Sequence, residues 1–300
     1  MHIINEKFMK TVIVTGAAGF MGINLVEALL KKNYFVYAIL RPGSAHNRRL
    51  TEGKQLKKIS IEMEHYDKLT DYIAEKCEAF FHLAWQGERD DFDVQKQNID
   101  YAIMALEAAK GLSCKRFLCT GSQAEYGIQH QLITEETLPD PYTAYGAAKL
   151  AACYLTKRRA EQLGIDWLWG RIFSVYGKYE PQGRLIPDLV MALRQRKTFN
   201  LTSATQNWDY LYSEDAAEAL IALVEQGRSG EIYNVANGDY HPLRYFTEQL
   251  HEQIAPKTVV QYGQKISKNE IVSLQPSVKK IFDDTGWEPK TSFMDGILLI

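Results

Sequence analysis

The sequence predicts an α/β protein in which a doubly wound parallel sheet carries a smaller C-terminal lobe. Three observations support this fold class. Short apolar runs alternate with helical segments through the first half of the chain, as in a parallel sheet with helices on both faces. The strands are almost continuously apolar, which is typical of a sheet buried on both sides. A glycine-rich turn joins the first strand to the first helix.

The first half supplies the strands of the predicted sheet. Six strands are expected, at Lys10–Gly16, Tyr34–Leu40, Lys57–Met63, Glu78–Ala84, Lys115–Gly121 and Ile165–Phe173. The helices expected between them are Phe20–Lys32, about Asp67–Lys76, about Phe92–Lys110 and about Tyr142–Leu163.

The alternation weakens after Gly177. Further elements are expected there, namely helices at Leu185–Arg196, Ser213–Gln226 and Leu243–Gln253 and a strand at Glu231–Val235. No linker separates the two parts, and the sequence shows no internal repeat. We therefore expect a first domain over residues 1–177 and a smaller lobe over residues 178–300, packed over the open edge of the sheet and partly interleaved with the first domain.

Composition excludes several classes of protein. Of 300 residues, 46% are hydrophobic and 24% are charged, which is ordinary for a soluble globular protein. No apolar run approaches the roughly 18 residues of a membrane span. The net charge is −2, so no global attraction to nucleic acid or to anionic membranes is expected.

The N-terminus and the cysteines favour a cytoplasmic location. The segment MHIINEKFMK lacks the basic and apolar regions of a secretory signal, and it is expected to be a short extension. The cysteines, which are Cys77, Cys114, Cys119 and Cys153, show no C-x-x-C spacing. We interpret them as reduced thiols and expect no metal site.

Gly16, Gly19 and Gly22 follow a G-x-x-G-x-x-G spacing between the first strand and the first helix. The first glycine permits a tight turn, the second lets the backbone approach a pyrophosphate, and the third allows close packing of the helix on the sheet. The helix N-terminus then offers free N–H groups to the phosphates. The spacing predicts a Rossmann site for NAD(P), and the alternative is a glycine turn without a ligand.

Arg41 lies where the choice between NAD and NADP is made. An NAD enzyme places an acid near the end of the second strand to bind the ribose 2′-hydroxyl, whereas this segment reads ILRPGS. Arginine cannot accept that hydrogen bond, but it can contact a 2′-phosphate, and Ser44, Arg48 and Arg49 could contribute. We expect NADP, with NAD as the alternative. Otherwise Arg41 is a solvated loop residue.

Tyr145 and Lys149 in TAYGAAK are four residues apart on a predicted helix, so they share a face. A tyrosine is a poor acid at neutral pH, and a nearby ammonium would lower its pKa. Ser122 ends the fifth strand, at the sheet edge where such folds bind ligands. Its hydroxyl could hydrogen-bond the oxygen that Tyr145 protonates. Together these residues predict acid–base chemistry on a carbonyl or hydroxyl group.

These motifs resemble the extended short-chain dehydrogenase/reductase family of nucleotide-sugar epimerases, dehydratases and reductases. The resemblance covers nearly the whole chain. It rests on TGAAGFMG, HLAW (His82–Trp85), Asn98, the Ser122 segment with Tyr126–Gly127, YxxxK, RIFSVYG (Arg171–Gly177), WDYLYSEDAAEAL (Trp208–Leu220) and TGWEPKTSFMDGI (Thr285–Ile297).

The resemblance implies roles for individual residues. Ser122, Tyr145 and Lys149 are implied to be catalytic, with Asn98 supporting a proton relay. Read locally, Asn98 could equally bond a backbone carbonyl. The candidate cofactor contacts are Gly16, Ala18, Gly19, Phe20, Met21, Gly22, Arg41, Glu62, Leu83, Ala84, Tyr145 and Lys149.

The segment after the fifth strand separates the members of the family. The dehydratases resemble one another in a Thr-Asp-Glu run whose two acids drive water elimination. The matching residues here are Ser122, Gln123 and Ala124. Neither Gln123 nor Ala124 can act as an acid or base, which disfavours a 4,6-dehydratase and leaves a reductase or an epimerase.

The substrate lobe departs from the family pattern. The arginine that meets the substrate diphosphate in the family is Trp208 here, and the asparagine of RxxNVYG is Ser174. Lys178 and Arg184 are candidate replacements, or else solvated charges. The aromatic residues could stack on a sugar or a base, or belong to the core; they are Trp85, Tyr176 and Trp208. Gln123 completes the set of substrate candidates, and His82 is expected to be a buried strand-end histidine.

The sequence leaves three functions open. The favoured one is an NADPH-dependent reductase of a 4-keto sugar joined to a nucleotide. The second is an NAD(P)-dependent nucleotide-sugar epimerase, and the third is a catalytically silent redox sensor. The family's dimers imply a homodimer paired through the helices near Phe92–Lys110 and Tyr142–Leu163. The sugar, the nucleotide and the product stereochemistry cannot be read from the sequence.

Overall fold

The computed structural model of the chain describes residues 10–265 and 272–300; the expected N-terminal extension lies outside them. A seven-stranded sheet runs in the order β11-β6-β5-β4-β1-β2-β3, and every neighbouring pair is parallel. The strands are β1 (Thr11–Thr15), β2 (Phe35–Leu40), β3 (Leu56–Ser60), β4 (Ala79–His82), β5 (Arg116–Ser122), β6 (Asp166–Ile172) and β11 (Glu231–Val235). The predicted Rossmann-type fold is confirmed.

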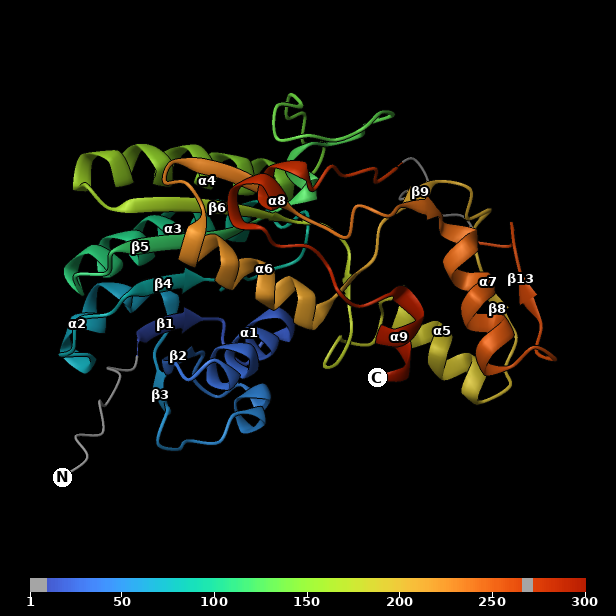
Figure 1. Cartoon of the computed structure of the whole chain (residues 1–300), viewed down its shortest axis with the longest axis horizontal. Coiled ribbons are helices and arrows are strands. Elements are labelled where there is room, and N and C mark those ends of the chain that lie inside the picture. The colour runs from blue at the N-terminus through green and yellow to red at the C-terminus, as the bar shows by residue number, and fades with distance from the viewer. Residues whose placement is uncertain (1–9, 266–271) are drawn as a thin grey trace.

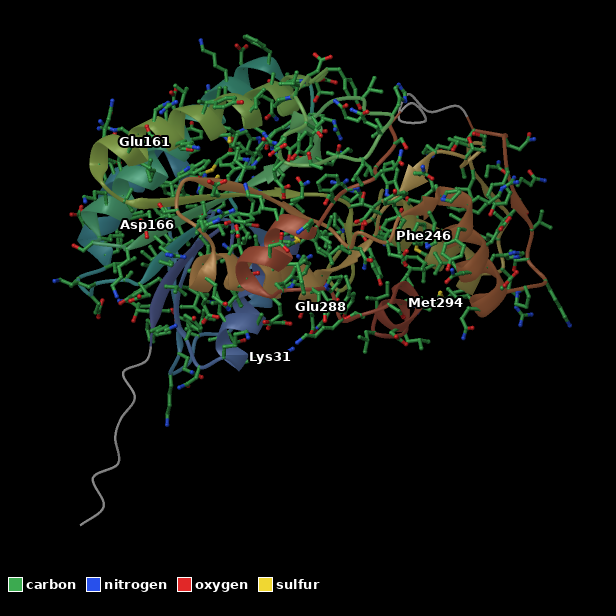
Figure 2. All side chains as sticks on the ribbon, turned by 45° about the horizontal axis from the view of Figure 1, so that its top comes forward. Lys31, Glu161, Asp166, Phe246, Glu288 and Met294 are labelled. Carbon is green, nitrogen blue, oxygen red and sulfur yellow. The ribbon has the colours of Figure 1, made fainter. Side chains whose placement is uncertain are left out.

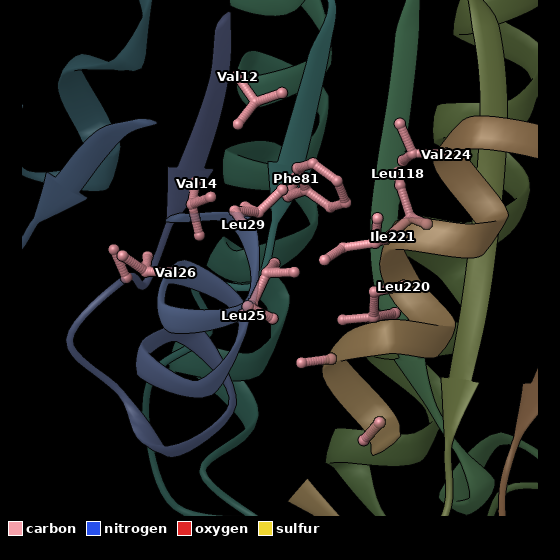
Figure 3. Close-up of a cluster of buried hydrophobic side chains, with 14 of the residues drawn as sticks. Val12, Val14, Leu25, Val26, Leu29, Phe81, Leu118, Leu220, Ile221 and Val224 are labelled. Carbon is pink, nitrogen blue, oxygen red and sulfur yellow. The ribbon is translucent and has the colours of Figure 1, made fainter. Parts of the chain in front are cut away.

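Two layers of helices bury the sheet (Figure 1). Helices α1 (Phe20–Lys31) and α6 (Ser213–Gln226) cover one face, and α3 (Phe92–Gly111) and α4 (Ala144–Leu163) cover the other. Alternate residues of one strand enter the two cores, because side chains of a strand point to opposite faces. In β1, Val12 and Val14 pack toward α1 and α6, as Figure 3 shows, whereas Ile13 packs with α3.

The second half of the chain returns to the sheet. Helix α6 packs beside α1, and β11 pairs with β6 along its whole length, from Glu231 to Val235. The strand expected at Glu231–Val235 is therefore the edge strand of the central sheet. Two elements from residues 178–300 complete the layers built by residues 10–177.

The smaller lobe has its own aromatic core. Its helices are α5 (Leu185–Arg194), α7 (Leu243–Ile254) and α9 (Phe293–Leu298). Two-residue strands pair as β8 (Phe199–Asn200) with β13 (Val260–Gln261), and β9 (Asn207–Trp208) with β12 (His241–Pro242). Tyr210, Phe246 and Phe293 pack at ring distances of 4.9–5.5 Å. Figure 2 shows Phe246 and Met294 in this lobe, at the opposite end of the molecule from Glu161 and Asp166.

Short elements connect the main ones. They are η1 (Ala45–Arg49), η2 (Met63–Lys68), α2 (Leu69–Tyr72), η3 (Gln123–Glu125), β7 (Val175–Tyr176), β10 (Leu211–Tyr212) and α8 (Lys279–Thr285). The helix predicted at Asp67–Lys76 is wrong in extent, because α2 ends at Tyr72. Ile73 is extended, with φ −125°, and its side chain is buried. Burial of Ile73 on the way into β4 overrides the helical pattern.

Within the described residues, no helix is long and apolar enough to cross a bilayer. The same part of the chain holds no group of three or more His, Cys, Asp or Glu side chains that could bind a metal ion. All four cysteines are buried free thiols.

Candidate active site

The glycine turn after β1 has the geometry that the sequence predicts. Gly16 has φ +66°, and a Cβ on it would come within 2.9 Å of the Ala84 nitrogen. A Cβ on Gly22 would overlap the Gly16 carbonyl oxygen. A side chain at either position would therefore break the turn or push α1 off the sheet.

A cavity of about 280 Å³ lies beside this turn, where the strand order reverses between β1 and β4. This is the point at which open α/β sheets bind ligands. Seven predicted cofactor contacts line the cavity, namely Gly16, Ala18, Gly19, Arg41, Glu62, Leu83 and Ala84. Phe20, Met21 and Gly22 form the first turn of α1 instead, and Trp85 lines the cavity although it was expected at the substrate.

Polar groups of the cavity fit a dinucleotide. Gly19 begins α1, and no side chain in the described ranges caps this helix N-terminus, which leaves its N–H groups for phosphate oxygens. Asn47 Oδ1 is buried without a hydrogen-bond partner among the described residues, so it can accept from a ribose hydroxyl. Arg41 is exposed, and its side chain makes no ion pair with any described residue. The cavity thus offers an acceptor for a hydroxyl and a cation for a phosphate.

The predicted catalytic side chains meet at the end of β5. Thr143 caps α4 by accepting a hydrogen bond from the Gly146 N–H at 3.1 Å. A Cβ on Gly146 would overlap the Ala124 carbonyl oxygen, so this glycine lets α4 approach η3 closely. That approach brings Tyr145 close enough to Ser122 for the Ser122 side chain to lower the pKa of Tyr145.

Burial and neighbouring side chains shift the pKa of Tyr145 in opposite directions. Burial raises it, while the Ser122 side chain and the charges of Arg89 and Arg184 lower it. The effect of Lys149 on this pKa stays a prediction. The Lys149 Nζ atom lies 6.0 Å from the Tyr145 ring centroid and donates to the Thr120 carbonyl at 2.7 Å.

Lys149 is buried beneath the catalytic edge. Its exposed fraction is 3%, and its Nζ atom lies 3.6 Å from the Trp85 ring centroid. Burial lowers the pKa of Lys149 to about 8, against the opposing effects of Cys119 and Glu125. The ammonium is held by one carbonyl and one aromatic face.

Asn98 and Gln95 fasten the loop after β4. Asn98 accepts from the Gln86 N–H at 3.2 Å and donates to the Gln86 carbonyl at 2.9 Å. Gln95 accepts from the Trp85 indole N–H at 2.8 Å. The structure thus brings Asn98 to the main chain, as the local reading allowed, and its role in a proton relay stays a prediction.

Sequence reasoning missed a buried ion pair under Ser122. Glu125 Oε2 lies 2.7 Å from Arg171 Nε, and both side chains are at most 1% exposed. Glu125 Oε1 accepts from the Ser122 N–H at 2.8 Å and from the Trp169 indole at 3.0 Å. The pair fixes the backbone of Ser122. The available signal was Arg171 within a predicted buried strand, since an arginine is almost never fully buried without a charged partner.

His82 is a structural histidine, as expected. It is 1% exposed, and its Nδ1 lies 2.8 Å from the Thr15 hydroxyl. Burial lowers its pKa to about 3. Thr15 also accepts from the Leu83 and Ala84 N–H groups, so the histidine and the threonine shape the cavity wall.

The substrate candidates lie on separate elements, and two of the aromatic ones belong to the lobe core. Ser174 precedes β7, and Gln123 begins η3. Lys178 is exposed, and its Nζ lies 3.8 Å from a Glu27 carboxylate oxygen. Trp208 packs into the lobe core, where its indole N–H is buried with no partner in the described chain. Tyr176 belongs to the core, since it is fully buried and donates to the Phe293 carbonyl.

The charge of Arg184, from the lobe, acts on Tyr145 and on the neighbouring carboxyl group of Glu180. Arg184 precedes α5. Glu180, which the sequence did not single out, has its Oε2 atom buried without a partner among the residues described. Burial raises its pKa to about 7.

Comparisons with known proteins identify the family. The model of the NAD dependent epimerase/dehydratase family matches residues 12–236. The dTDP-D-glucose 4,6-dehydratase of Bos taurus is 24% identical, over 97% of this chain and 88% of the relative. The fold is also that of the UDP-glucose 4-epimerase of Thermotoga maritima, solved with UDP-glucose, with a TM-score of 0.84 at 21% identity and coverage of 96% of each chain.

A second solved structure is the UDP-glucuronic acid 4-epimerase of Bacillus cereus in complex with NAD. Its TM-score is 0.83 at 23% identity, and the match covers 96% of each chain. The resemblance read from the sequence motifs is confirmed by these matches. The chain belongs to the NAD dependent epimerase/dehydratase family.

Proposed function

We propose that the chain is a nicotinamide-dependent oxidoreductase of a nucleotide-linked sugar, and that it reduces a 4-keto sugar with NADPH. One observation carries the proposal. The Ser122 side chain lies close enough to Tyr145, at the carboxyl edge of the sheet, to lower its pKa, and Trp85, which meets the Tyr145 ring edge-on, lines a cavity that suits a dinucleotide. A proton donor at the carboxyl edge of the sheet, beside a cavity for a dinucleotide, suits redox chemistry on a carbonyl group.

The residues divide the work at the reacting carbon. A bound nicotinamide supplies the hydride. The Tyr145 hydroxyl gives its proton to the carbonyl oxygen, and the Ser122 hydroxyl orients that oxygen by a hydrogen bond. The Lys149 ammonium, held at the Thr120 carbonyl, stabilises the phenolate that remains. Glu125 keeps the Ser122 backbone in place.

A nucleotide sugar is the substrate class that the family supports. The named relatives and neighbours act on, or were solved with, such compounds. Gln123 and Ala124 stand where the resemblance gives the dehydratases two acids, and neither can drive an elimination. This favours redox chemistry without loss of water.

Cofactor choice separates the reductase from its alternative. The exposed Arg41 beside the cavity supports a 2′-phosphate contact and therefore NADPH. The second candidate is an epimerase that recycles one NAD. Asn47 Oδ1 favours it, because this unpaired acceptor suits a free ribose hydroxyl. The solved neighbour from Bacillus cereus contains NAD.

Cofactor stoichiometry tests these functions. The purified protein is incubated with a panel of nucleotide sugars and their 4-keto forms, and absorbance of the reduced nicotinamide is followed. We expect one NADPH oxidised for each 4-keto sugar consumed. Interconversion of sugars without net oxidation would establish the epimerase. Cofactor binding without turnover on any panel member would favour a redox sensor.

We further propose a cytoplasmic homodimer. Helices α3 and α4 each span 20 residues and pack side by side. On α4, Tyr154 and Leu155 are 53% and 50% exposed, which would suit burial against a second copy of the helix pair. Sedimentation should show a dimer at micromolar concentration, and Leu155→Asp should shift it toward monomer. A wild-type monomer would contradict this assembly.

A further inference from the structure

Trp85 occupies a fixed position between the cofactor cavity and the catalytic side chains. Its indole N–H donates to Gln95 Oε1 at 2.8 Å. Gln95 is itself held, because its amide donates to the Glu88 carbonyl at 2.9 Å and to the Gln86 carbonyl at 3.3 Å. The Trp85 indole is therefore bonded at its only polar atom, and the Gln95 amide that accepts this bond is held by two carbonyls. These bonds fix the plane of the Trp85 ring.

The ring plane of Trp85 lies against the Lys149 ammonium. The Nζ atom is 3.6 Å from the ring centroid, well inside the range of cation–π contacts. An ammonium has three N–H donors, and the Thr120 carbonyl takes one at 2.7 Å. The indole face provides the second favourable contact in a site from which water is almost excluded, since Lys149 is 3% exposed.

Trp85 also borders the two neighbours of Lys149 that matter for chemistry. It lines the cofactor cavity, and its ring meets the Tyr145 ring edge-on at 6.2 Å and 89°. We propose that Trp85 is a positioning residue, whose indole face holds the Lys149 ammonium between the cofactor cavity and Tyr145. The proposal rests on the proposed function only for its activity test.

Three other titratable groups interact with the Lys149 charge. Cys119 on β5 and Glu125 on η3 both raise the pKa of Lys149. The charge of Lys149 in turn lowers the pKa of His82 on β4. Tyr145 lies on the same helix, with its ring centroid 6.0 Å away. Burial dominates and lowers the pKa of Lys149 to about 8. A lost aromatic face would lower this pKa further, because the charged form would lose a stabilising contact.

The first test needs no substrate. The protein contains five tryptophans, so their indole ¹⁵N–¹H signals can be followed against pH, with the Trp85 signal assigned by its loss in Trp85→Phe. We expect the Trp85 signal to shift with a midpoint near pH 8 and the shift to vanish in Lys149→Met. Trp287→Phe, at a tryptophan beside the second cavity, is the matched control and should leave the transition unchanged. A Trp85 signal that does not titrate, or that still titrates in Lys149→Met, overturns the proposal.

The second test uses turnover with the substrate found in the stoichiometry panel. Trp85→Leu keeps the site apolar without an aromatic face, and the basic limb of its pH–rate profile should move down by roughly 0.5–1.5 pH units. Trp85→Phe should restore most of the wild-type profile, whereas a purely structural Trp85 would change the rate at all pH values equally. An unshifted limb in Trp85→Leu overturns the proposal. If no nucleotide sugar is turned over, the proposed function fails while the indole titration still decides the role of Trp85.

Discussion

The carboxyl groups of Glu125, below Ser122, and of Glu180, in the smaller lobe, have contrasting surroundings. Glu125 has partners for both oxygens, in Arg171, the Trp169 indole and the Ser122 N–H. Glu180 Oε2 is buried without a partner in the described chain. We call Glu125, Arg171 and Trp169 the paired groups. We call the buried atoms Glu180 Oε2 and Asn47 Oδ1, together with the exposed cation of Arg41, the unpaired groups.

This contrast separates polar groups that serve the fold from polar groups that are open to a ligand. A buried polar atom without a partner costs free energy, and a ligand that donates to Asn47 Oδ1 or Glu180 Oε2 would supply the partner. Arg41 is exposed and carries no such cost. The paired groups satisfy one another, and their substitution should damage stability or chemistry whatever the ligand. Substitution of the unpaired groups should change the affinity for a ligand or the pH dependence of stability.

The largest effect is expected at Tyr145. Tyr145→Phe keeps the ring and its packing but removes the proton that the reaction needs. Turnover should fall by about 10²–10⁴-fold, while cofactor affinity, measured by fluorescence titration, stays near the wild-type value. Near-normal turnover would discard the mechanism, even if the cofactor still binds.

The next effect concerns stability. Glu125→Leu leaves the Arg171 guanidinium buried without its carboxylate, and it should lower the free energy of unfolding by about 3–5 kcal/mol. Urea denaturation followed by circular dichroism measures this loss. The double variant Glu125→Leu/Arg171→Leu is the control and should recover most of it. A single variant as stable as the wild type would show that Glu125 is not a paired group in the sense used here.

Arg41 tests an unpaired cation. Arg41→Ala should weaken NADPH binding by about 1.5–3 kcal/mol, because a charge-assisted bond to the 2′-phosphate is lost. NADH binding should change far less. Lys54→Ala is a control, since Lys54 is an exposed cation that does not line the cavity. Equal losses for NADPH and NADH would remove the argument for NADP.

The smallest effect is expected from Glu180 in the absence of ligand. Its folded pKa of about 7 lies above the ordinary glutamate value of 4.5. The folded state therefore binds an extra proton between these pH values, and it loses stability as the pH rises from about 4.5 to 7. Glu180→Gln should remove this loss and be more stable at pH 8 by about 1–2 kcal/mol, after allowance for partial exposure. Thermal denaturation at pH 5 and pH 8 measures it. A variant less stable than the wild type at pH 8 would mean that Arg184 and the Gly177 backbone, which lower this pKa, outweigh the cost of burial.

The parallel sheet was predictable because local signals suffice for it. Apolar runs, glycine spacing and strand–helix alternation are properties of neighbouring residues, and six of the seven strands of the sheet were placed in order from them. The membership of β11 was not predictable, since its pairing with β6 depends on residues more than 60 positions apart. The helix at Asp67–Lys76 failed because burial of Ile73 is a tertiary effect.

The positions of the candidate site residues could be predicted where a sequence motif determines the backbone geometry. Gly16 and Gly22 are required by turn geometry, and Tyr145 and Lys149 share a face by helical spacing. The direction of the Lys149 side chain was not readable, because it depends on the Thr120 carbonyl and the Trp85 ring, which other elements supply. Glu180 escaped notice for the same reason, since nothing in its neighbours along the chain predicts an unpaired oxygen.

The pairing of β11 with β6 also determines when the central sheet can be completed during synthesis. After residue 177 has left the ribosome, six parallel strands are available, but β6 still has a bare edge that only residues 231–235 cover. About fifty further residues of the lobe must be made before that strand arrives, and at roughly 5–20 residues per second this takes several seconds. During this interval the β6 edge is an open template for other chains. The nascent protein therefore depends on delayed capping of β6, and its exposure to misassembly is greatest just before the last strand of the sheet emerges.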